Sequence, residues 1–316
     1  MNARAPIPLV VVGGYLGAGK TTLLNRLLAN ARGCRIAVLV NDFGAVNIDA
    51  ALVRARSDDV IELENGCICC SIGGRLAEAL VAIAARAQRP ELLVIEASGV
   101  SDPLRIAQVG LLDPAFRLNA VLVAVDVTGL HHSLNDPLVG DMVRRQVMGA
   151  SAVVLTKVDL AQSGAGARAA DAVGRLAPRA AVLWGQSGEL PLSVFLDAAL
   201  PPSRGSGALL AGARWQRVQD ASHAGIRSVA YQTLRRFNKA RLREALVTVP
   251  VRLLRAKGLV WLDADPRLHE LHLVGGRIRL RPAERADFRG SALVFIGAFD
   301  AVAEQNIRAS MEAALA

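Results

Sequence analysis

The stretch Gly13-Gly14-Tyr15-Leu16-Gly17-Ala18-Gly19-Lys20-Thr21-Thr22 decides the fold of this chain. It follows the apolar run 9–12 and precedes a leucine-rich amphipathic segment, a pattern that predicts a strand, a glycine loop and a helix. The spacing is that of a phosphate-binding P-loop, GxxxxGK(S/T), with Gly14 as the first glycine and Lys20 as the lysine. A glycine-rich turn with a chance lysine is the alternative, and the flanking strand and helix argue against it.

Each residue type in this loop has a role in phosphate chemistry. Glycines let backbone N–H groups close around the phosphates, and the N-terminus of the following helix adds a partial positive charge. Lys20 should reach the β- and γ-phosphates, and the Thr21 hydroxyl should ligate Mg²⁺. The predicted nucleotide-binding residues of the loop are Gly14, Gly17, Ala18, Gly19, Lys20, Thr21 and Thr22.

Length and composition predict a two-domain protein. The chain has 316 residues, of which 52% are hydrophobic, enough for one large and one smaller core. No apolar run reaches the roughly 18 to 20 residues that a membrane span needs, and residues 1–8 lack a signal-peptide core. The four cysteines, three of them within residues 67–70, are too few and too clustered for a disulfide framework, so they indicate a reducing compartment. We therefore expect a cytoplasmic protein without a membrane partner.

The net charge of +9 does not by itself indicate nucleic acid. Most of the 37 basic residues are arginines spread along the whole chain, and no basic run forms. The aromatic side chains that would stack on bases make up only 4% of the residues. A solvated arginine surface is the favoured interpretation, and nucleic-acid binding is not expected.

Acidic residues follow two apolar runs that are typical of strands buried on both faces of a parallel sheet. Asp42 lies just after the run 36–40, and Asp49 lies a few residues further along. Polar groups at the carboxyl ends of such strands face the ligand crevice, so both aspartates are candidates for the loop that meets the γ-phosphate and Mg²⁺. Capping of a turn is the alternative for each of them.

Glu96 ends the second of these runs, residues 91–95. A P-loop enzyme keeps its Walker-B carboxylate after a buried strand of this kind. Glu96 would hold Mg²⁺, most simply through water, or position the attacking water. Together with Lys20 and Thr21 it completes the predicted catalytic group, and capping of the next helix is the alternative.

Three thiols lie within four residues in the segment Cys67-Ile68-Cys69-Cys70. Thiolates are soft ligands that suit Zn²⁺, Cu⁺ or similar ions. Three ligands leave a coordination position open, which suits a metal that is handed on, and Cys34 is too distant in sequence to be assumed as a fourth ligand. Two alternatives stay open: some of these cysteines are small buried apolar residues, or adjacent thiols pair on oxidation in a redox sensor.

A base-binding loop is predicted at Thr156-Lys157-Val158-Asp159, directly after an apolar strand. Its spacing is that of the guanine-binding loop of GTPases, usually NKxD. The Asp159 carboxylate can accept two hydrogen bonds, from the guanine N1–H and from the exocyclic amine, which adenine cannot donate. Lys157 would pack its stem along the base. The pattern has weight because a P-loop lies upstream.

The first domain is predicted to span residues 1–200 as a doubly wound, mostly parallel α/β sheet. Residues 178–183 are expected as its last strand and residues 190–200 as its closing helix. Residues 201–222 have the composition of a linker, and residues 223–316 are expected to form a smaller α+β domain.

The second domain contains a predicted hairpin. Residues 269–274 and 277–281 flank the pair Gly275-Gly276, which is typical of a two-residue turn. Arg277, Arg279 and Arg281 share one face of the second strand. A solvated face is the favoured interpretation, with a partner surface as the alternative.

Together these motifs resemble the CobW-type metallochaperone GTPases, which are P-loop proteins. The resemblance covers nearly the whole chain, and the combination of the P-loop with the thiol segment and the EASG segment is highly specific. The segments that carry it are GGYLGAGKTTLLN (13–25), NDFG (41–44), NGCICC (65–70), VIEASGVSDP (94–103), LTKVD (155–159), LLRAKGLVWLD (253–263) and LVFIG (293–297).

The resemblance implies a Mg²⁺-dependent GTPase that binds GTP and GDP. It implies that Cys67, Cys69 and Cys70 bind Zn²⁺, or a related ion such as Co²⁺ or Fe²⁺. The ion would be handed to a client apo-metalloprotein when the nucleotide state changes. In the sequence the thiols fall between Asp42 and Glu96, which predicts that they lie near the same sheet edge as the γ-phosphate.

Other functions are kept beside this one. A redox-responsive nucleotide-binding switch and a cobalt or iron insertion factor of the same family are the alternatives. A small-molecule kinase is disfavoured because the sequence has no evident lid for an acceptor substrate. Homo-oligomerisation is left open.

Three departures from the family pattern bear on the site. Thr156 replaces the usual asparagine, which bears on the strictness of guanine selection. Val40 and Ala45 stand where some or many relatives have glutamate, which weakens the case for an extra carboxylate metal site. Many relatives carry a histidine-rich tract before the second domain, whereas here only His223 remains, so metal storage by imidazoles is not expected.

Overall fold

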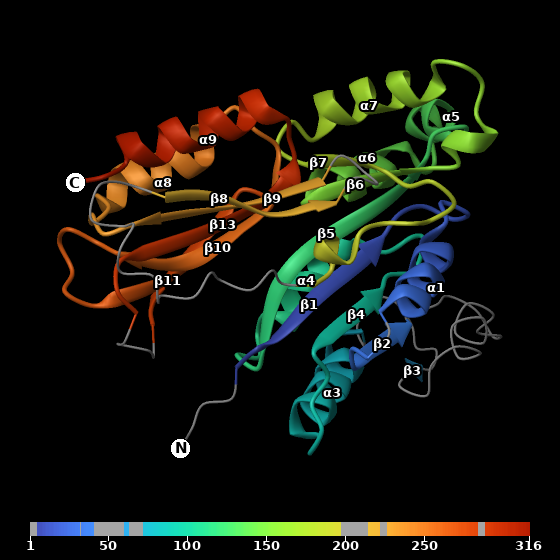
Figure 1. The fold of residues 1–316 in the computed structure, drawn as a ribbon. Coiled ribbons are helices and arrows are strands. Elements are labelled where there is room, and N and C mark those ends of the chain that lie inside the picture. The colour runs from blue at the N-terminus through green and yellow to red at the C-terminus, as the bar shows by residue number, and fades with distance from the viewer. Residues whose placement is uncertain are drawn as a thin grey trace. The chain divides into compact units, whose positions relative to one another are not determined.

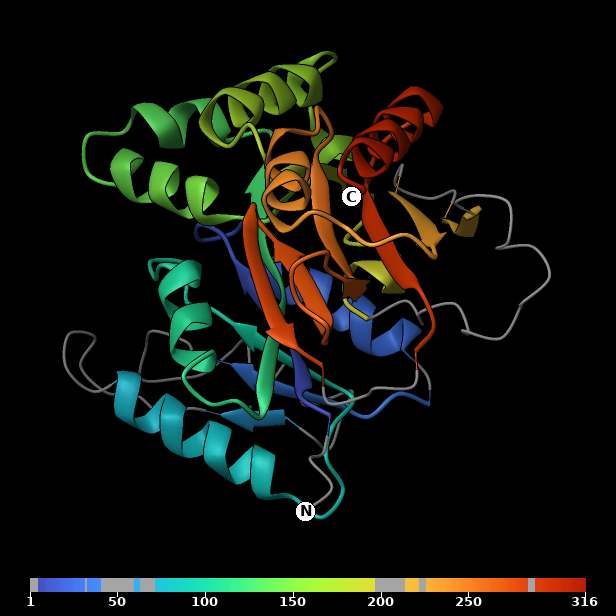
Figure 2. The ribbon, with the colours of Figure 1, turned by 90° about the vertical axis from the view of Figure 1, so that its left-hand side faces the viewer.

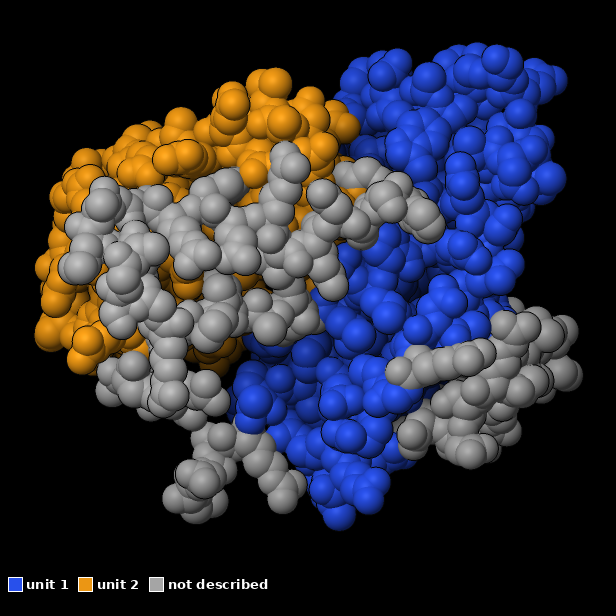
Figure 3. Space-filling view, in the orientation of Figure 1, with its two compact units in different colours: residues 1–178, 182–197 blue, residues 179–181, 198–316 orange. Residues whose placement is uncertain are grey.

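The computed structural model describes residues 5–31, 33–40, 60–62, 72–196, 214–221, 226–283 and 288–316. The chain divides into two compact units, coloured separately in Figure 3. Unit 1 comprises residues 1–178 and 182–197, and unit 2 comprises residues 179–181 and 198–316. Each unit is built around its own sheet.

Unit 1 contains a seven-stranded sheet, and the six strands from β3 to β6 in the order given below run parallel to their neighbours (Figure 1). Three of its strands, β2, β4 and β6, are buried at every residue, as expected for a sheet covered on both faces. In spatial order the strands are β3 (Val60–Glu62), β2 (Ile36–Val40), β4 (Leu92–Glu96), β1 (Ile7–Gly13), β5 (Phe116–Asp126), β6 (Ala152–Thr156) and β7 (Ala181–Trp184).

Helices lie on both faces of this sheet, which confirms the predicted doubly wound fold. Right-handed crossovers require it: the chain moves one way across the sheet from β1 to β2, and the other way from β3 to β4 and from β4 to β5. Accordingly, α1 lies on the opposite face from α3 and α4 (Figure 2). The helices are α1 (Lys20–Asn30), α3 (Ile72–Ala85), α4 (Pro103–Gly110), α5 (Leu130–Asn135), α6 (Gly140–Gly149) and α7 (Ala165–Leu176), with short 3-10 turns η1 (Val158–Leu160) and η2 (Leu192–Val194).

The chain reverses its direction across the sheet at β1, between neighbours β4 and β5. In open α/β sheets, ligands bind beyond the carboxyl ends of the strands at such a reversal. The P-loop follows β1 at this position, so the fold puts the predicted phosphate loop where a crevice is expected.

Unit 2 contains a six-stranded antiparallel sheet, and the two helices described in this unit pack against each other. The expected α+β class is therefore confirmed. Its helices are α8 (Lys239–Thr248) and α9 (Ala301–Ala313). In spatial order its strands are β12 (Arg277–Pro282), β11 (Leu268–Val274), β10 (Leu253–Trp261), β13 (Ser291–Ala298), β9 (Ile226–Thr233) and β8 (Arg214–Ala221).

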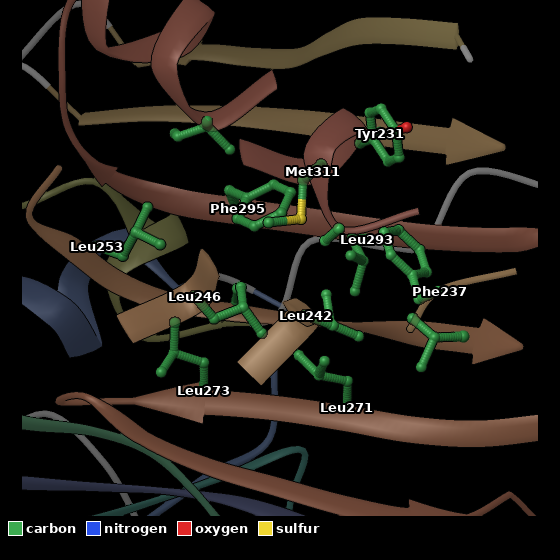
Figure 4. Close-up of a cluster of buried hydrophobic side chains, with 14 of the residues drawn as sticks. Tyr231, Phe237, Leu242, Leu246, Leu253, Leu271, Leu273, Leu293, Phe295 and Met311 are labelled. Carbon is green, nitrogen blue, oxygen red and sulfur yellow. The ribbon is translucent and has the colours of Figure 1, made fainter. Parts of the chain in front are cut away.

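The core of unit 2 lies between one face of its sheet and these two helices (Figure 4). Alternate residues of the central strands supply it, for example Leu293 and Phe295 of β13, which are fully buried. Leu242 of α8 and Met311 of α9 meet them from the helices. Tyr231 and Phe237 add an aromatic pair with ring centroids 6.2 Å apart.

The predicted hairpin is confirmed. β11 and β12 pair antiparallel, and both turn residues have positive φ, 55° at Gly275 and 76° at Gly276. This backbone suits glycine at both positions and matches the twist of the flanking strands. Arg277, Arg279 and Arg281 are all exposed on β12, in accordance with the predicted solvated face.

Two expectations about the end of the first domain need correction. The predicted closing helix, residues 190–200, is represented in the described part of the chain only by the short turn η2 (Leu192–Val194). The predicted linker, residues 201–222, includes strand β8, which pairs with β9. Composition alone does not reveal this strand, because its partner β9 lies further along the chain. The outer bounds of the two domains otherwise stay a prediction.

No helix within the described ranges has both the length and the hydropathy needed to cross a lipid bilayer.

Candidate nucleotide-binding site

The backbone of the P-loop requires its glycines. Gly14, Gly17 and Gly19 have φ values of 130°, 72° and 90°, in the region that side chains rarely tolerate. A Cβ atom at Gly14 would also collide with the carbonyl oxygen of Ala124 on β5. The loop is thus closely packed on the sheet and turns directly into α1, for which Gly19 is the N-cap residue.

A pocket of about 260 Å³ opens at the P-loop. It brings together the start of α1, the end of β2, and the end of β4 with the turn that follows it. Its lining residues are Leu16, Gly17, Gly19, Lys20, Thr21, Thr22, Val40, Glu96, Ala97, Ser98 and Gly99. Six of the residues predicted for phosphate or magnesium binding therefore share one cavity, although they come from two distant parts of the sequence.

The pocket holds a cation, a hydroxyl and a carboxylate in proximity. Lys20 is only 8% exposed, and its Nζ donates to the Tyr15 carbonyl oxygen at 3.4 Å. The Thr21 hydroxyl donates to Oε1 of Glu96 at 3.1 Å, and Glu96 is 2% exposed. Hydroxyl and carboxylate oxygens are the ligands that Mg²⁺ prefers, and a buried lysine suits a phosphate, so this donor set fits a magnesium nucleotide.

Thr156 connects the P-loop to the predicted base-binding loop. Its buried hydroxyl lies 2.8 Å from the carbonyl oxygen of Ala18 and 3.1 Å from that of Val125. A threonine at the position where asparagine is usual therefore still makes a side-chain hydrogen bond to the P-loop backbone. Thr156 thus binds the backbone of Ala18. Ala18 is not among the residues that line the pocket.

Asp126, at the end of β5, fixes the lysine of the TKVD segment. Its Oδ2 lies 2.7 Å from Nζ of Lys157, and its Oδ1 accepts from the backbone N–H and the hydroxyl of Thr128 at 2.8 and 2.6 Å. Burial opposes ionisation of this carboxyl, but the hydrogen bonds from Lys157 and Thr128 outweigh it and lower the Asp126 pKa below its ordinary value of 3.8. Lys157 itself has a left-handed backbone, with φ 55°, and Asp159 is exposed in η1.

Five of the predicted site residues lie outside the described ranges. They are Asp42, Asp49, Cys67, Cys69 and Cys70. Among the residues that the structure does describe, no group of three histidine, cysteine or acidic side chains is placed to hold a metal ion.

Cys34, the remaining cysteine, lies just before β2, at the opposite end of that strand from the pocket. Burial raises the pKa of its thiol, and the neighbouring Glu91 carboxylate raises it further. A thiol in such surroundings is a poor metal ligand and a poor nucleophile.

Sequence reasoning missed three contributors to this region. The first is Asp126, whose partner Lys157 is close in space but distant in sequence, so no local pattern connects the two residues. Gln146 of α6 is 1% exposed and contacts the turn after β4. Its signal was a polar residue between the buried Val143 and Val147 on the apolar side of the helix.

The third contributor is the loop after β7, which packs on α1. The Ser187 carbonyl oxygen accepts from Nε of Arg26 at 3.2 Å, and a Cβ atom at Gly188 would lie 2.8 Å from the Thr22 methyl group. The positive φ values of Ser187 and Gly188 shape this contact. A short irregular loop of this kind has no sequence periodicity from which its partner could be predicted.

The parallel sheet, the glycine loop, the buried Lys20 and Glu96, and the half-buried Thr21 define a P-loop nucleotide-binding protein. Two family descriptions match the chain: "CobW/HypB/UreG, nucleotide-binding domain" over residues 8–183 and "Cobalamin synthesis protein cobW C-terminal domain" over residues 226–315. The first alone covers more than half of the chain. The protein therefore belongs to the CobW family, which confirms the resemblance seen in the sequence.

Curated relatives match over both units. The zinc chaperone YjiA of Escherichia coli (strain K12) is 30% identical over 279 residues, which cover 83% of this chain and 84% of the relative. Zinc-regulated GTPase metalloprotein activator 1 of Dictyostelium discoideum is 29% identical over 306 residues. That match covers 83% of this chain but only 64% of the relative, so the chain spans less than two thirds of that protein's length.

Among solved structures, the Zn(II)-bound YjiA GTPase from E. coli aligns with a TM-score of 0.48 and 22% sequence identity. The alignment covers 98% of this chain and 99% of that chain.

Proposed function

We propose that the protein is a Mg²⁺-dependent GTPase that carries Zn²⁺ and delivers it to a client metalloprotein. The observation that carries the GTPase part is the hydrogen bond between the half-buried Thr21 and the buried Glu96 in the P-loop pocket. A hydroxyl and a carboxylate that is 2% exposed are held together at the P-loop, and these oxygens are ligands that the Mg²⁺ of a nucleotide prefers. The names of the relatives, which include GTPases and zinc chaperones, support the same conclusion.

Each side chain of the pocket has a separate task in this mechanism. Lys20 balances the charge that develops on the terminal phosphate, and the P-loop N–H groups bind the phosphate oxygens. Thr21 and Glu96 would hold Mg²⁺, which neutralises charge on the β- and γ-phosphates when bound. Glu96 is also the carboxylate that we propose to orient the attacking water.

Guanine selection belongs to the TKVD segment. Asp159 accepts from the guanine N1–H and the exocyclic amine, and its exposure leaves the carboxylate accessible to a base. Lys157 is held by Asp126, so its stem presents a fixed apolar surface along the base. Thr156 keeps this segment attached to the P-loop, which links base binding to phosphate binding.

Zinc is the proposed cargo, bound by Cys67, Cys69 and Cys70. The connectivity of the described strands supports a location near the nucleotide. Glu62 ends β3 in register with Val40, and Val40 is in register with Glu96. The chain thus enters the thiol segment at the edge of the sheet that carries Glu96. A chain spans at most about 3.6 Å per residue, so Cys67 lies within about 18 Å of Glu62.

Nearness of this kind would allow the nucleotide state to alter zinc affinity. A coupling of about 1 to 3 kcal/mol between the two sites shifts an affinity by roughly 5- to 150-fold, which is enough to bias transfer. Unassisted GTPases are slow, at about 10⁻³ to 10⁻² s⁻¹. We therefore propose a switch that releases cargo and not a fast metabolic enzyme. A cytoplasmic location is part of the same proposal.

Hydrolysis and zinc binding can be tested on the full chain with one set of variants. We expect wild-type protein to hydrolyse GTP faster than ATP in the presence of Mg²⁺ and to bind zinc. The triple change Cys67→Ser, Cys69→Ser and Cys70→Ser should remove the bound zinc, whereas Cys34→Ser, the matched control, should retain it. Equal hydrolysis of GTP and ATP would contradict the GTPase assignment. Zinc binding by the triple variant would contradict the cargo assignment, and a disulfide formed in the wild type under mild oxidation with no zinc bound would favour the redox alternative.

A further inference from the structure

One buried amide holds the turn that forms a wall of the nucleotide pocket. Gln146, on α6, is 1% exposed, and its Nε2 donates to the carbonyl oxygens of Gly99 at 3.1 Å and Ser101 at 2.8 Å. Within the described residues its Oε1 has no hydrogen-bond partner. Both donors of the amide are therefore directed at the same short turn, and the acceptor is left unused.

The turn in question directly follows Glu96 and lines the pocket with Ser98 and Gly99. It is closed by a hydrogen bond from the Ser101 N–H to the Ser98 carbonyl oxygen at 2.9 Å. On the pocket side it is packed against the P-loop, because a Cβ atom at Gly99 would lie 2.6 Å from the Leu16 side chain. The turn is thus held between the P-loop on one side and α6 on the other.

The buried position of Gln146 on α6 would ordinarily favour an apolar side chain. Its helix neighbours Val143 and Val147 are buried, and an apolar residue would avoid the cost of a buried amide with an unused acceptor. The two turn carbonyls supply a reason for the amide, since each would otherwise be left without this donor. The two hydrogen bonds to the turn offset the free energy lost by burying Oε1 without a partner among the described residues.

We propose that Gln146 is a positioning residue for GTP hydrolysis. Its amide keeps the turn after Glu96 in place, so that Glu96 and Gly99 stay at the distance from the P-loop that the terminal phosphate requires. The inference rests on the proposed GTPase function. It also makes α6 a mechanical partner of the pocket, because a shift of that helix would move Gly99 and Ser101 with it.

The test compares Gln146→Glu and Gln146→Leu with the exposed neighbour on the same helix, Arg145→Gln, in the full chain. Gln146→Glu keeps the shape of the side chain but removes both donors. We expect kcat for GTP to fall about 10- to 100-fold in both Gln146 variants, the range that a small misplacement of reacting groups produces. The affinity for GDP should stay within about twofold, and Arg145→Gln should match wild type.

A structural role alone would give another pattern. Loss of folded protein lowers kcat and the number of GDP sites per chain in proportion, so the stoichiometry of GDP binding separates the two cases. Hydrogen exchange of the peptide 97–103 is the second measurement, and it should be faster in Gln146→Glu while exchange of β1 is unchanged. Normal kcat in folded Gln146→Glu would overturn the positioning role and leave the GTPase function intact. A wild-type chain without GTPase activity would overturn both.

Discussion

The two sheets of this protein bury their strands in different ways, and the difference shows why the candidate site residues lie at strand ends in unit 1. In unit 1, β4 is buried at every residue because helices cover both faces of a parallel sheet. In unit 2, β12 alternates exposed arginines with half-buried apolar residues, as the outer strand of an antiparallel sheet can. A strand that is buried throughout can offer polar groups to a ligand only at its ends. Glu96 and Asp126 are at the ends of their strands, whereas the arginines of β12 are spread along an exposed strand face.

The comparison predicts that the largest loss of activity comes from the pocket of unit 1. Lys20→Ala should reduce GTP hydrolysis by at least about 1,000-fold, because it removes a buried cation from the site where phosphate charge develops. The matched control is Lys239→Ala at the exposed start of α8, which should hydrolyse GTP at the wild-type rate. Rates of phosphate release measure both. Retention of activity in Lys20→Ala would break the assignment of chemistry to unit 1.

The core of unit 2 should give the largest loss of stability without a matching loss of chemistry. Phe295→Ala removes a fully buried ring between β13 and the two helices, and it should lower the free energy of unfolding by about 3 to 5 kcal/mol. Chemical denaturation with a probe in unit 2, such as Trp261, measures this change. Below the unfolding midpoint, GTP hydrolysis should stay within about twofold of wild type. A proportionate loss of kcat in folded protein would show that the two units are not separable in function.

A smaller effect is expected at the base-binding edge of unit 1. Asp126→Asn removes the charge that holds Lys157, so the preference for GTP over ATP should fall by about tenfold, equivalent to about 1.4 kcal/mol. Competition of GTP and ATP for the site measures the preference. Asp141→Asn is the control, since Asp141 is exposed and pairs only with a surface arginine in the described structure. An unchanged preference would mean that Asp126 supports only the fold.

The smallest effect is expected on the exposed face of β12. Replacement of Arg277, Arg279 and Arg281 by glutamine should change the free energy of unfolding by no more than about 0.5 kcal/mol per residue, and GTP hydrolysis should not change. The positive charges of Arg279 and Arg281 repel each other. Their removal relieves this repulsion, which offsets part of the stability lost with the solvation of the guanidinium groups. A loss of client activation with normal hydrolysis would instead identify this face as a partner surface.

Local patterns predicted most of the fold and which residues of the P-loop and of β4 line the candidate pocket. The P-loop, Glu96 after a buried strand, and the Gly275-Gly276 hairpin each depend on residues that are adjacent in the sequence, and the structure places all of them as expected in the fold. Tertiary contacts decided the remainder. The hydrogen bond from Thr156 to Ala18 joins residues that lie far apart in the chain, so no periodicity could reveal it.

The predicted closing helix shows that a local pattern can also predict an element that tertiary contacts prevent. Residues 190–200 have the apolar spacing of a helix, but only the η2 turn forms among the residues described there. The Phe195 carbonyl oxygen instead accepts from the buried side chain of Asn119 on β5, at 2.7 Å. A tertiary contact of this kind is specified by a partner strand and not by the spacing of the segment itself, so propensity alone predicted the wrong element.

The central claim is that the nucleotide at Lys20 and the zinc ion at the thiol segment influence each other. The most direct measurement is zinc affinity of the full chain with a non-hydrolysable GTP analogue and with GDP, by competition with a chelating indicator at fixed pH. We predict that the two affinities differ by roughly 5- to 150-fold. The difference should vanish in the triple change Cys67→Ser, Cys69→Ser and Cys70→Ser and persist in Cys34→Ser. Equal zinc affinity in both nucleotide states of the wild type would contradict the account.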